Sequence, residues 1–104
     1  MIEAMRSAFA SGQVKWRLHA LQRMLERNIG RADVAQVVAT GEVIETYPVG
    51  KPFPACLIGG RAGSRPIHAV IGWDAGAEMA YMITVYEPDL EHFEADFKTR
   101  RIKE

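Results

Sequence analysis

The sequence predicts an α+β domain in which N-terminal helices pack mainly on one face of an antiparallel sheet. Two features of the chain predict this class. Up to Thr40 the apolar residues recur every three or four positions, whereas from Glu42 they alternate with polar residues and are rich in β-branched types. The connections between the predicted strands are also too short for helical crossovers, so neighbouring strands should run antiparallel.

The length and composition are those of one packed domain. The 104 residues are 48% hydrophobic and 25% charged, which argues against disorder and against a coiled coil. A chain of this length holds one core, so we expect residues 1–104 to form a single domain. Cys56 is the single cysteine, so no intramolecular disulfide can form, and no apolar run reaches the roughly 18 residues of a membrane helix. We therefore expect a cytoplasmic protein.

Three helices are predicted within the first 40 residues. They span residues 2–11, 16–28 and 31–40, and Gly41 follows the last of them, as is typical of a helix end. In the second helix the apolar side chains fall on one side at about 100° per residue, which predicts a stripe that faces the core. The stripe consists of Leu18, Leu21, Met24 and Leu25.

Four strands and a last helix complete the predicted fold. The strands span residues 43–47, 55–61, 65–74 and 78–86. A loop rich in proline and glycine follows the first strand, and two short turns separate the others. Leu90, Phe93 and Phe97 have helical spacing, which predicts a helix over residues 88–97. The expected architecture is a four-stranded antiparallel sheet with N-terminal helices on one face and a C-terminal helix.

Positive charge gathers on the predicted second helix although the whole chain is neutral. Thirteen Lys and Arg residues balance thirteen Asp and Glu residues, which removes any argument from net charge to a nucleic-acid ligand. Residues 15–31, however, carry five basic side chains and one acidic one. His19, Arg23 and Arg27 lie at i, i+4 and i+8, on one strip of the helix. Such a strip suits a phosphate backbone, and a solvated helix face is the alternative.

A second candidate site lies on the predicted sheet. Strand alternation places His68 on the face opposite the apolar residues of its own strand. We assume a hairpin register that pairs Trp73 with Met79. This register sets His68 opposite Thr84, with Tyr86 on the same face. The alternatives are a structural histidine bonded to a threonine and, for Tyr86, a strand-end aromatic with its hydroxyl in water.

The remaining polar residues offer weaker candidates, and no cofactor or metal is expected. Arg61 precedes a tight turn, where it can bind a phosphate or simply keep the hairpin soluble. Neither a dinucleotide-binding motif nor a P-loop is present, and the histidines share no metal-ligand spacing with Cys56. Cys56 is expected to be a buried strand residue. The carboxylates of residues 87–96 fit acid–base chemistry, but matching of the helix dipole is the simpler interpretation.

Several blocks of the chain, in order, resemble a known family. The blocks are His19–Arg27, Arg31–Val34, Thr40–Pro48, Arg65–Val70 and Ile83–Pro88. Together they cover about residues 16–98 and resemble the small bacterial proteins of domain-of-unknown-function family 4258 (DUF4258). The resemblance implies a relation to the fold shared by barnase, EndoU, colicin D and RelE-type toxins. In that fold, helices precede an antiparallel sheet whose surface cleaves RNA without a metal ion.

The resemblance also implies site residues and a partner. It singles out His19, Arg23, His68, Thr84 and Tyr86, which the residue patterns also indicate. It further implies a toxin that pairs with a small zinc-binding antitoxin of the MqsA type. The chain departs from the family at Gly30, where a serine helix cap is usual, and this change should affect stability more than function.

The first functional hypothesis is therefore a metal-independent ribonuclease toxin. Cleavage without a metal needs a base for the 2′-hydroxyl, an acid for the leaving oxygen and a cation for the phosphorane charge. The acid–base pair would be His19 and His68, and Tyr86 would stack a base or donate a proton. Catalytic roles are assigned to His19, His68, Tyr86 and Arg23, and substrate-binding roles to Arg27, Arg61 and Thr84.

Two other classes of function stay open. The chain can instead be a non-catalytic binding module of the same fold whose sheet or helix strip docks a partner protein, including the antitoxin. A helix-turn-helix DNA binder around Gly30 ranks below both, because its recognition helix over residues 31–40 offers few side chains that read base edges.

Overall fold

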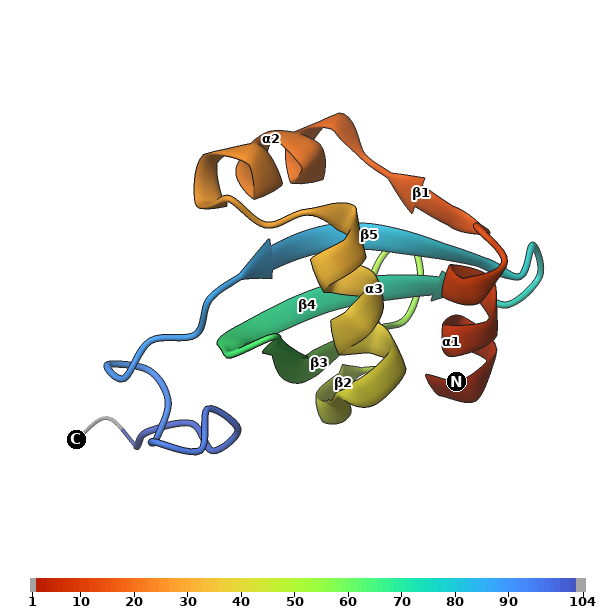
Figure 1. The fold of residues 1–104 in the computed structure, drawn as a ribbon. Coiled ribbons are helices and arrows are strands. Elements are labelled where there is room, and N and C mark those ends of the chain that lie inside the picture. The colour runs from red at the N-terminus through yellow and green to blue at the C-terminus, as the bar shows by residue number, and fades with distance from the viewer. Residues whose placement is uncertain (1, 103–104) are drawn as a thin grey trace.

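Residues 2–102, which the computed structural model describes, form three helices and five strands (Figure 1). In chain order these are α1 (Ile2–Ala10), β1 (Val14–Trp16), α2 (Leu18–Arg27), α3 (Arg31–Thr40), β2 (Glu42–Tyr47), β3 (Ala55–Ala62), β4 (Arg65–Asp74) and β5 (Met79–Tyr86). None of these helices is long and apolar enough to cross a membrane. The α+β class follows from this order, but two parts of the predicted architecture need correction.

The sheet is mixed and has five strands, in the order β1-β5-β4-β3-β2. Strands β2 to β5 form the antiparallel meander that the sequence predicts, whereas β1 adds a parallel edge strand beside β5. The prediction of a four-stranded antiparallel sheet is therefore wrong. The reason is that β1 is only three residues long, and its last residue, Trp16, falls within the predicted helix over residues 16–28. Such a short strand is defined by its long-range pairing with β5 and not by its own sequence.

The predicted C-terminal helix is also wrong. Residues 88–102, called the C-terminal segment below, contain no helix and fold back on themselves, with an antiparallel bridge between Phe93 and Arg100. The carboxylates of Asp89 and Asp96 each accept hydrogen bonds from the backbone amides two and three positions further along the chain, and such turns compete with helix formation. Phe97 has a left-handed φ of 57°, which a continuous helix cannot contain.

The core lies between the three helices and one face of the sheet. Figure 1 shows α1 and α3 in front of the strands and α2 beside β5. The helical side chains of this core are Met5, Ala8, Ala20, Met24, Val34, Val37 and Val38. The predicted stripe of α2 is correct only in part, because Leu18 is 71% exposed and Leu25 is 84% exposed. α2 contacts the sheet chiefly at β5, so a narrow side of the helix is covered.

The register of β4 against β5 differs from the predicted one. The alignment is displaced by one residue at Trp73, which pairs with Ala80, and a β-bulge then inserts a further residue into β5. As a result His68 lies directly opposite Tyr86, and the predicted pairing of His68 with Thr84 is wrong. The alternation itself holds, since the apolar neighbours of His68 on β4 lie in the helix-covered core. His68 and Tyr86 therefore share the face that points away from the helices.

Candidate functional site

His68 is buried under the C-terminal segment. Its side chain is 1% exposed, its Nε2 atom lies 2.6 Å from the carbonyl oxygen of Phe97, and its ring contacts that of Phe93 edge-on at 4.6 Å between centroids. Burial lowers the pKa of His68 below its ordinary value, so the imidazole is neutral at pH 7. A neutral imidazole has one N–H, and the carbonyl of Phe97 can only accept. Nε2 is therefore the donor, which leaves Nδ1 as an acceptor.

Tyr86 completes a chain of polar contacts that starts at this acceptor. The Tyr86 hydroxyl oxygen lies 3.4 Å from Nδ1 of His68, and the two rings are 5.4 Å apart between centroids. Since Nδ1 carries no proton, the hydroxyl donates. Burial raises the pKa of Tyr86, so the phenol stays protonated near neutral pH. The neutral His68 thus orients the hydroxyl group of a protonated Tyr86.

Tyr86 opens into a pocket of about 460 Å³ that it shares with Arg27, Glu87 and Asp89. Arg27 comes from the end of α2, and its Nη1 donates to the carbonyl of Val85 at 2.7 Å. That bond places a guanidinium next to the end of β5. The pocket therefore combines one cation, one neutral phenol and two carboxylates, which is a set that can bind a phosphate and move protons.

Arg65 fixes two walls of this pocket. Its Nε donates to the Glu87 carboxylate at 2.6 Å, and its two terminal nitrogens donate to the carbonyls of Arg27 and Asn28 at the end of α2. One side chain of β4 thereby holds the end of α2 and the residue after β5 in a fixed relation. Arg65 was not singled out in the sequence, because its partners lie 22 or more positions away.

A second cavity, of about 440 Å³, has His68 in its lining. It lies between the end of α3, strand β3 and the C-terminal segment, and its lining includes Arg61, His68, Glu42, Asp96 and Lys98. Glu42 and Lys98 form an ion pair across it at 2.5 Å. Arg61 donates to the carbonyl of Ser64 at 2.9 Å, which stabilises the β3–β4 turn. Arg61 therefore has a structural partner as well as a place in this cavity.

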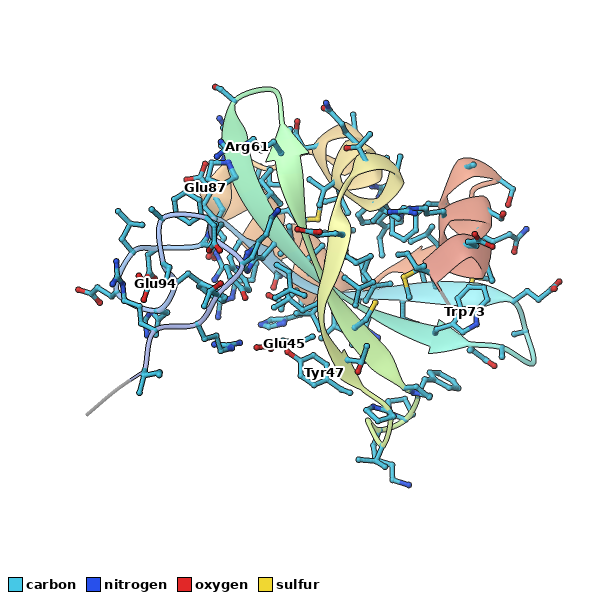
Figure 2. The ribbon with its side chains drawn as sticks, turned by 90° about the horizontal axis from the view of Figure 1, so that it is seen from below. Glu45, Tyr47, Arg61, Trp73, Glu87 and Glu94 are labelled. Atoms are coloured by element: carbon cyan, nitrogen blue, oxygen red, sulfur yellow. The ribbon has the colours of Figure 1, made fainter. Side chains whose placement is uncertain are left out.

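An ion pair holds the C-terminal segment against β2. The guanidinium of Arg100 donates to both carboxylate oxygens of Glu45 and lies over the ring of Phe93, 4.9 Å from its centroid. The hydrogen bond from Arg100 keeps the pKa of Glu45 below its ordinary value. Figure 2 shows Glu45 and Tyr47 next to each other on β2, on the side of the sheet where the C-terminal segment with Glu94 lies. The sequence does not reveal this segment and its contacts, because the apolar spacing of residues 88–97 predicts a helix there.

The structure separates the predicted site residues into two groups. It brings His68 and Tyr86 together, adds Arg27 beside Tyr86 and places Arg61 at the second cavity. His19 is exposed on α2, Arg23 pairs with Glu26 on that helix, and Thr84 pairs with Val70 in the sheet. None of these last three predicted residues lines either cavity. Glu87 lines the first cavity instead, and it belongs to the carboxylates of residues 87–96 for which the sequence left acid–base chemistry open.

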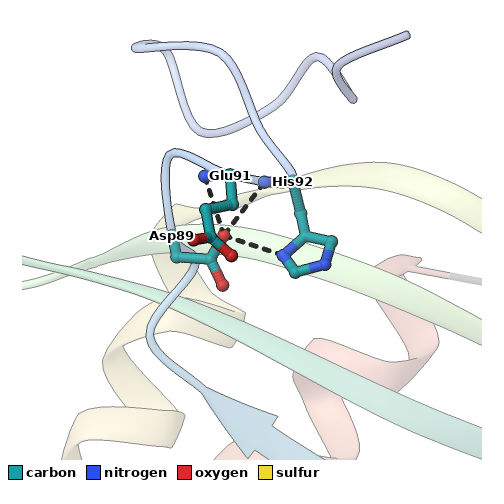
Figure 3. A group of neighbouring side chains, drawn as sticks. All are labelled: Asp89, Glu91 and His92. Atoms are coloured by element: carbon teal, nitrogen blue, oxygen red, sulfur yellow. Dashed lines mark hydrogen bonds and ion pairs between the residues drawn. The ribbon is translucent and has the colours of Figure 1, made fainter. Parts of the chain in front are cut away.

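Asp89, Glu91 and His92 gather ligand-type atoms within 4.8 Å of one another (Figure 3). All three side chains are exposed. Oδ1 of Asp89 accepts from the backbone amides of Glu91 and His92 and lies 2.8 Å from Nδ1 of His92. The His92 contacts hold the pKa of Asp89 below its ordinary value. These bonds account for the cluster as a turn that begins the C-terminal segment.

Comparison with known proteins identifies the family. A family model described as a domain of unknown function, DUF4258, matches residues 16–87, well over half of the chain. The chain belongs to the DUF4258 family. No curated protein and no solved structure gives a significant match to it. The DUF4258 match contains the candidate residues Arg27, His68, Tyr86 and Glu87, whereas the C-terminal segment follows it.

Proposed function

We propose that this DUF4258 protein binds single-stranded RNA and cleaves it without a metal ion in the pocket beside Tyr86. The observation that supports this proposal is the placement of a protonated Tyr86, backed by His68, in one pocket with Arg27 and Glu87. The biological role that fits such an activity is that of a cytoplasmic toxin held in check by a small zinc-binding antitoxin.

The chemistry uses three side chains of the pocket. Arg27 binds the scissile phosphate and stabilises the charge that develops on its oxygens. Glu87 accepts the proton of the 2′-hydroxyl as that oxygen forms a bond to phosphorus. Tyr86, whose O–H points at Nδ1 of His68 before RNA binds, turns this O–H to the 5′-oxygen and donates the proton there as the bond from phosphorus to that oxygen breaks. The products are a 2′,3′-cyclic phosphate and a free 5′-hydroxyl. Return of the proton from Glu87 to the Tyr86 phenolate, directly or through water, restores the protein.

His68 acts in this proposal as a positioning residue and not as the acid or base itself. Its side chain is 1% exposed, so it does not touch RNA while the C-terminal segment lies over it. Its Nδ1 atom instead orients the Tyr86 hydroxyl. This role replaces the pairing of His19 with His68, since His19 lies on the exposed surface of α2 and outside the pocket.

Purified full-length protein tests the cleavage directly. We expect it to cut a labelled single-stranded RNA in the presence of a chelator, to release cyclic-phosphate ends and to leave the 2′-deoxy analogue intact. Tyr86→Phe, which removes only the hydroxyl, should slow cleavage by about 100-fold or more. The matched control Tyr47→Phe removes the hydroxyl of a tyrosine outside the pocket and should cut like the parent. RNA that stays intact with the parent, or equal rates for Tyr86→Phe and the parent, would refute the proposal.

The role of His68 has its own readout. In His68→Asn, a side-chain amide replaces the ring and no longer reaches Phe97, so Tyr86 loses its fixed orientation. We expect kcat to fall while KM for RNA changes little, and the alkaline limb of the kcat profile to move, because that limb reports Tyr86. A loss of activity that matches only a loss of folded protein, with an unchanged pH profile, would show a purely structural role.

One observation favours a protein-docking module as the second candidate. Leu18 and Leu25 are 71% and 84% exposed on α2, and large exposed apolar side chains on one helix are typical of a surface that contacts a partner. If this is the function, the chain leaves RNA intact and forms a stoichiometric complex with the product of the adjacent reading frame. Leu25→Glu should weaken that complex, whereas it should leave RNA cleavage unchanged if the first proposal holds.

A further inference from the structure

Two stacked aromatic rings form a small platform at the opposite end of β4 from His68. Phe53 and Tyr81 lie 5.0 Å apart between centroids with 22° between their planes, and both side chains are half-buried. Phe53 belongs to the loop before β3, and Tyr81 belongs to β5. The two rings line a cavity of about 90 Å³. The two rings and the other residues that line this cavity are here called the aromatic platform; these other residues are Arg17, Lys51, Pro52, Gly72 and Ile83.

Gly72 and the apolar side chain of Ile83 form the floor of the aromatic platform. Gly72 lies directly opposite Tyr81 in the sheet, so no side chain of β4 rises between the rings and the strand. A Cβ at Gly72 would lie 3.5 Å from Cδ1 of Ile83 and 3.7 Å from Cβ of Tyr81, so these two side chains flank the glycine at ordinary contact distance. Ile83 is 40% exposed and adds an apolar edge.

The charged residues of the aromatic platform are both basic. Arg17 lies over the ring of Tyr81, 5.6 Å from its centroid, and both Arg17 and Lys51 are exposed. Among residues 2–102 neither side chain forms an ion pair, so their N–H groups are available for a ligand. The other cavities described above each include carboxylates, whereas the lining of this one has none. Its charge therefore favours an anionic ligand.

We propose that the aromatic platform binds one unpaired nucleotide of single-stranded RNA, with the base packed against the stacked pair of Phe53 and Tyr81 and the phosphate held by Arg17 and Lys51. An aromatic surface flanked by cations is the usual solution for single-stranded nucleic acid, since every base has a face that stacks and every nucleotide has a negative charge. A neutral or basic peptide would gain little from two cations without a carboxylate beside them.

The position of the aromatic platform on the sheet suits this role. Gly72 and His68 lie on one face of β4, four residues apart, which is about 13 Å along a strand. One RNA strand can therefore stack on the aromatic platform and reach the pocket beside Tyr86. The identity of the ligand as RNA rests on the proposed function, but the binding itself does not require cleavage.

A 2′-O-methyl oligouridylate separates binding from cleavage, because it lacks the hydroxyl that would attack. We expect the full-length protein to bind the fluorescently labelled oligomer, and Tyr81→Leu to weaken binding by about tenfold or more. Tyr81→Phe keeps a ring and should bind like the parent. Arg17→Gln and Lys51→Gln should each weaken binding and reduce the salt dependence by about one phosphate contact. The matched control Arg31→Gln removes an exposed charge at the start of α3, outside the aromatic platform, and should change affinity by less than about twofold.

The outcomes distinguish this proposal from the cleavage proposal. Folding of each variant is checked by its thermal midpoint. If the oligomer binds and Tyr81→Leu weakens it while natural RNA stays intact, the aromatic platform stands and the cleavage proposal fails. If natural RNA is cut but Tyr81→Leu binds as tightly as the parent, the aromatic platform is wrong and cleavage stands. Absence of binding by the parent also overturns the aromatic platform.

Discussion

The Nε2 atom of His68 and the carbonyl oxygen of Phe97 lie 2.6 Å apart, although 29 positions separate the two residues in the chain. This hydrogen bond ties the most buried polar side chain of the sheet to a segment without helix or strand. It fixes the tautomer of His68 and, through it, the direction of the Tyr86 hydroxyl. The position of the C-terminal segment and the orientation of the Tyr86 hydroxyl are therefore coupled.

Mild acid should destabilise the protein through His68. Burial holds the pKa of His68 below 6.5, its value in an unfolded chain. The unfolded chain therefore binds more protons between these two pKa values. The contribution of the neutral ring to stability is complete above about pH 6.5 and is lost as the pH falls below it. Urea unfolding between about pH 5 and pH 8 should show this decline.

Two substitutions assign the acid effect to one residue. In His68→Gln the ring is replaced by an amide that does not titrate, so the slope of the unfolding free energy between about pH 5 and pH 6.5 should flatten. His19→Gln removes an exposed histidine of α2 and should keep the slope of the parent. Equal slopes for His68→Gln and the parent would contradict the assignment.

Loss of the Arg100–Glu45 ion pair should loosen the C-terminal segment. Arg100→Gln removes the charge that bonds to Glu45 and lies over Phe93. Exposed ion pairs contribute at most about 1 kcal/mol, so the open population should rise by up to about fivefold. Hydrogen exchange of the Glu94 and Arg101 amides, which bond within the segment, measures this opening. Arg23→Gln breaks an ion pair on α2 and should leave both amides unchanged.

Phe93 should be the apolar anchor of the same segment. Its side chain is 2% exposed and contacts the ring of His68, so Phe93→Ala removes a buried aromatic contact of about 3 kcal/mol. We expect the segment to open and His68 to react faster with an imidazole-acylating reagent, as read by mass spectrometry. Leu90→Ala, at a position that is 53% exposed, is the matched control. Unchanged reactivity of His68 in Phe93→Ala would mean that Phe93 does not hold the C-terminal segment over His68.

Gly41 should tolerate no side chain, because α3 and β3 meet there. A Cβ at Gly41 would lie 2.5 Å from the Val37 carbonyl oxygen and 2.6 Å from that of Gly59, both backbone atoms that cannot move aside alone. We expect Gly41→Ala to lower the unfolding free energy by about 2 kcal/mol or more. At Gly30 the nearest atom to a Cβ is an Asp33 carboxylate oxygen at 3.6 Å, so Gly30→Ala should unfold close to the parent. Similar urea midpoints for the two variants would refute this account.

Local patterns in the sequence predicted the parts of the fold that depend on local geometry. The period of the apolar residues located α1, α2 and α3, and strand alternation located β2 to β5 within a residue or two. Alternation also placed His68 on the face away from the helices. These predictions were correct because the period of side chains along a helix or strand is a property of the backbone itself.

Long-range pairing decided the rest. The bulge in β5 sets His68 opposite Tyr86, and no pattern within either strand specifies a bulge. The three-residue strand β1 exists because β5 supplies its hydrogen bonds, and α2 buries Met24 but not Leu25 because only one side of the helix meets the sheet. The C-terminal segment lies over His68 through contacts with residues 29 or more positions away. Local sequence patterns thus determined the face of the sheet on which a side chain lies. The residues that contact that side chain, and the segment that buries it, depend on long-range pairing in the tertiary structure.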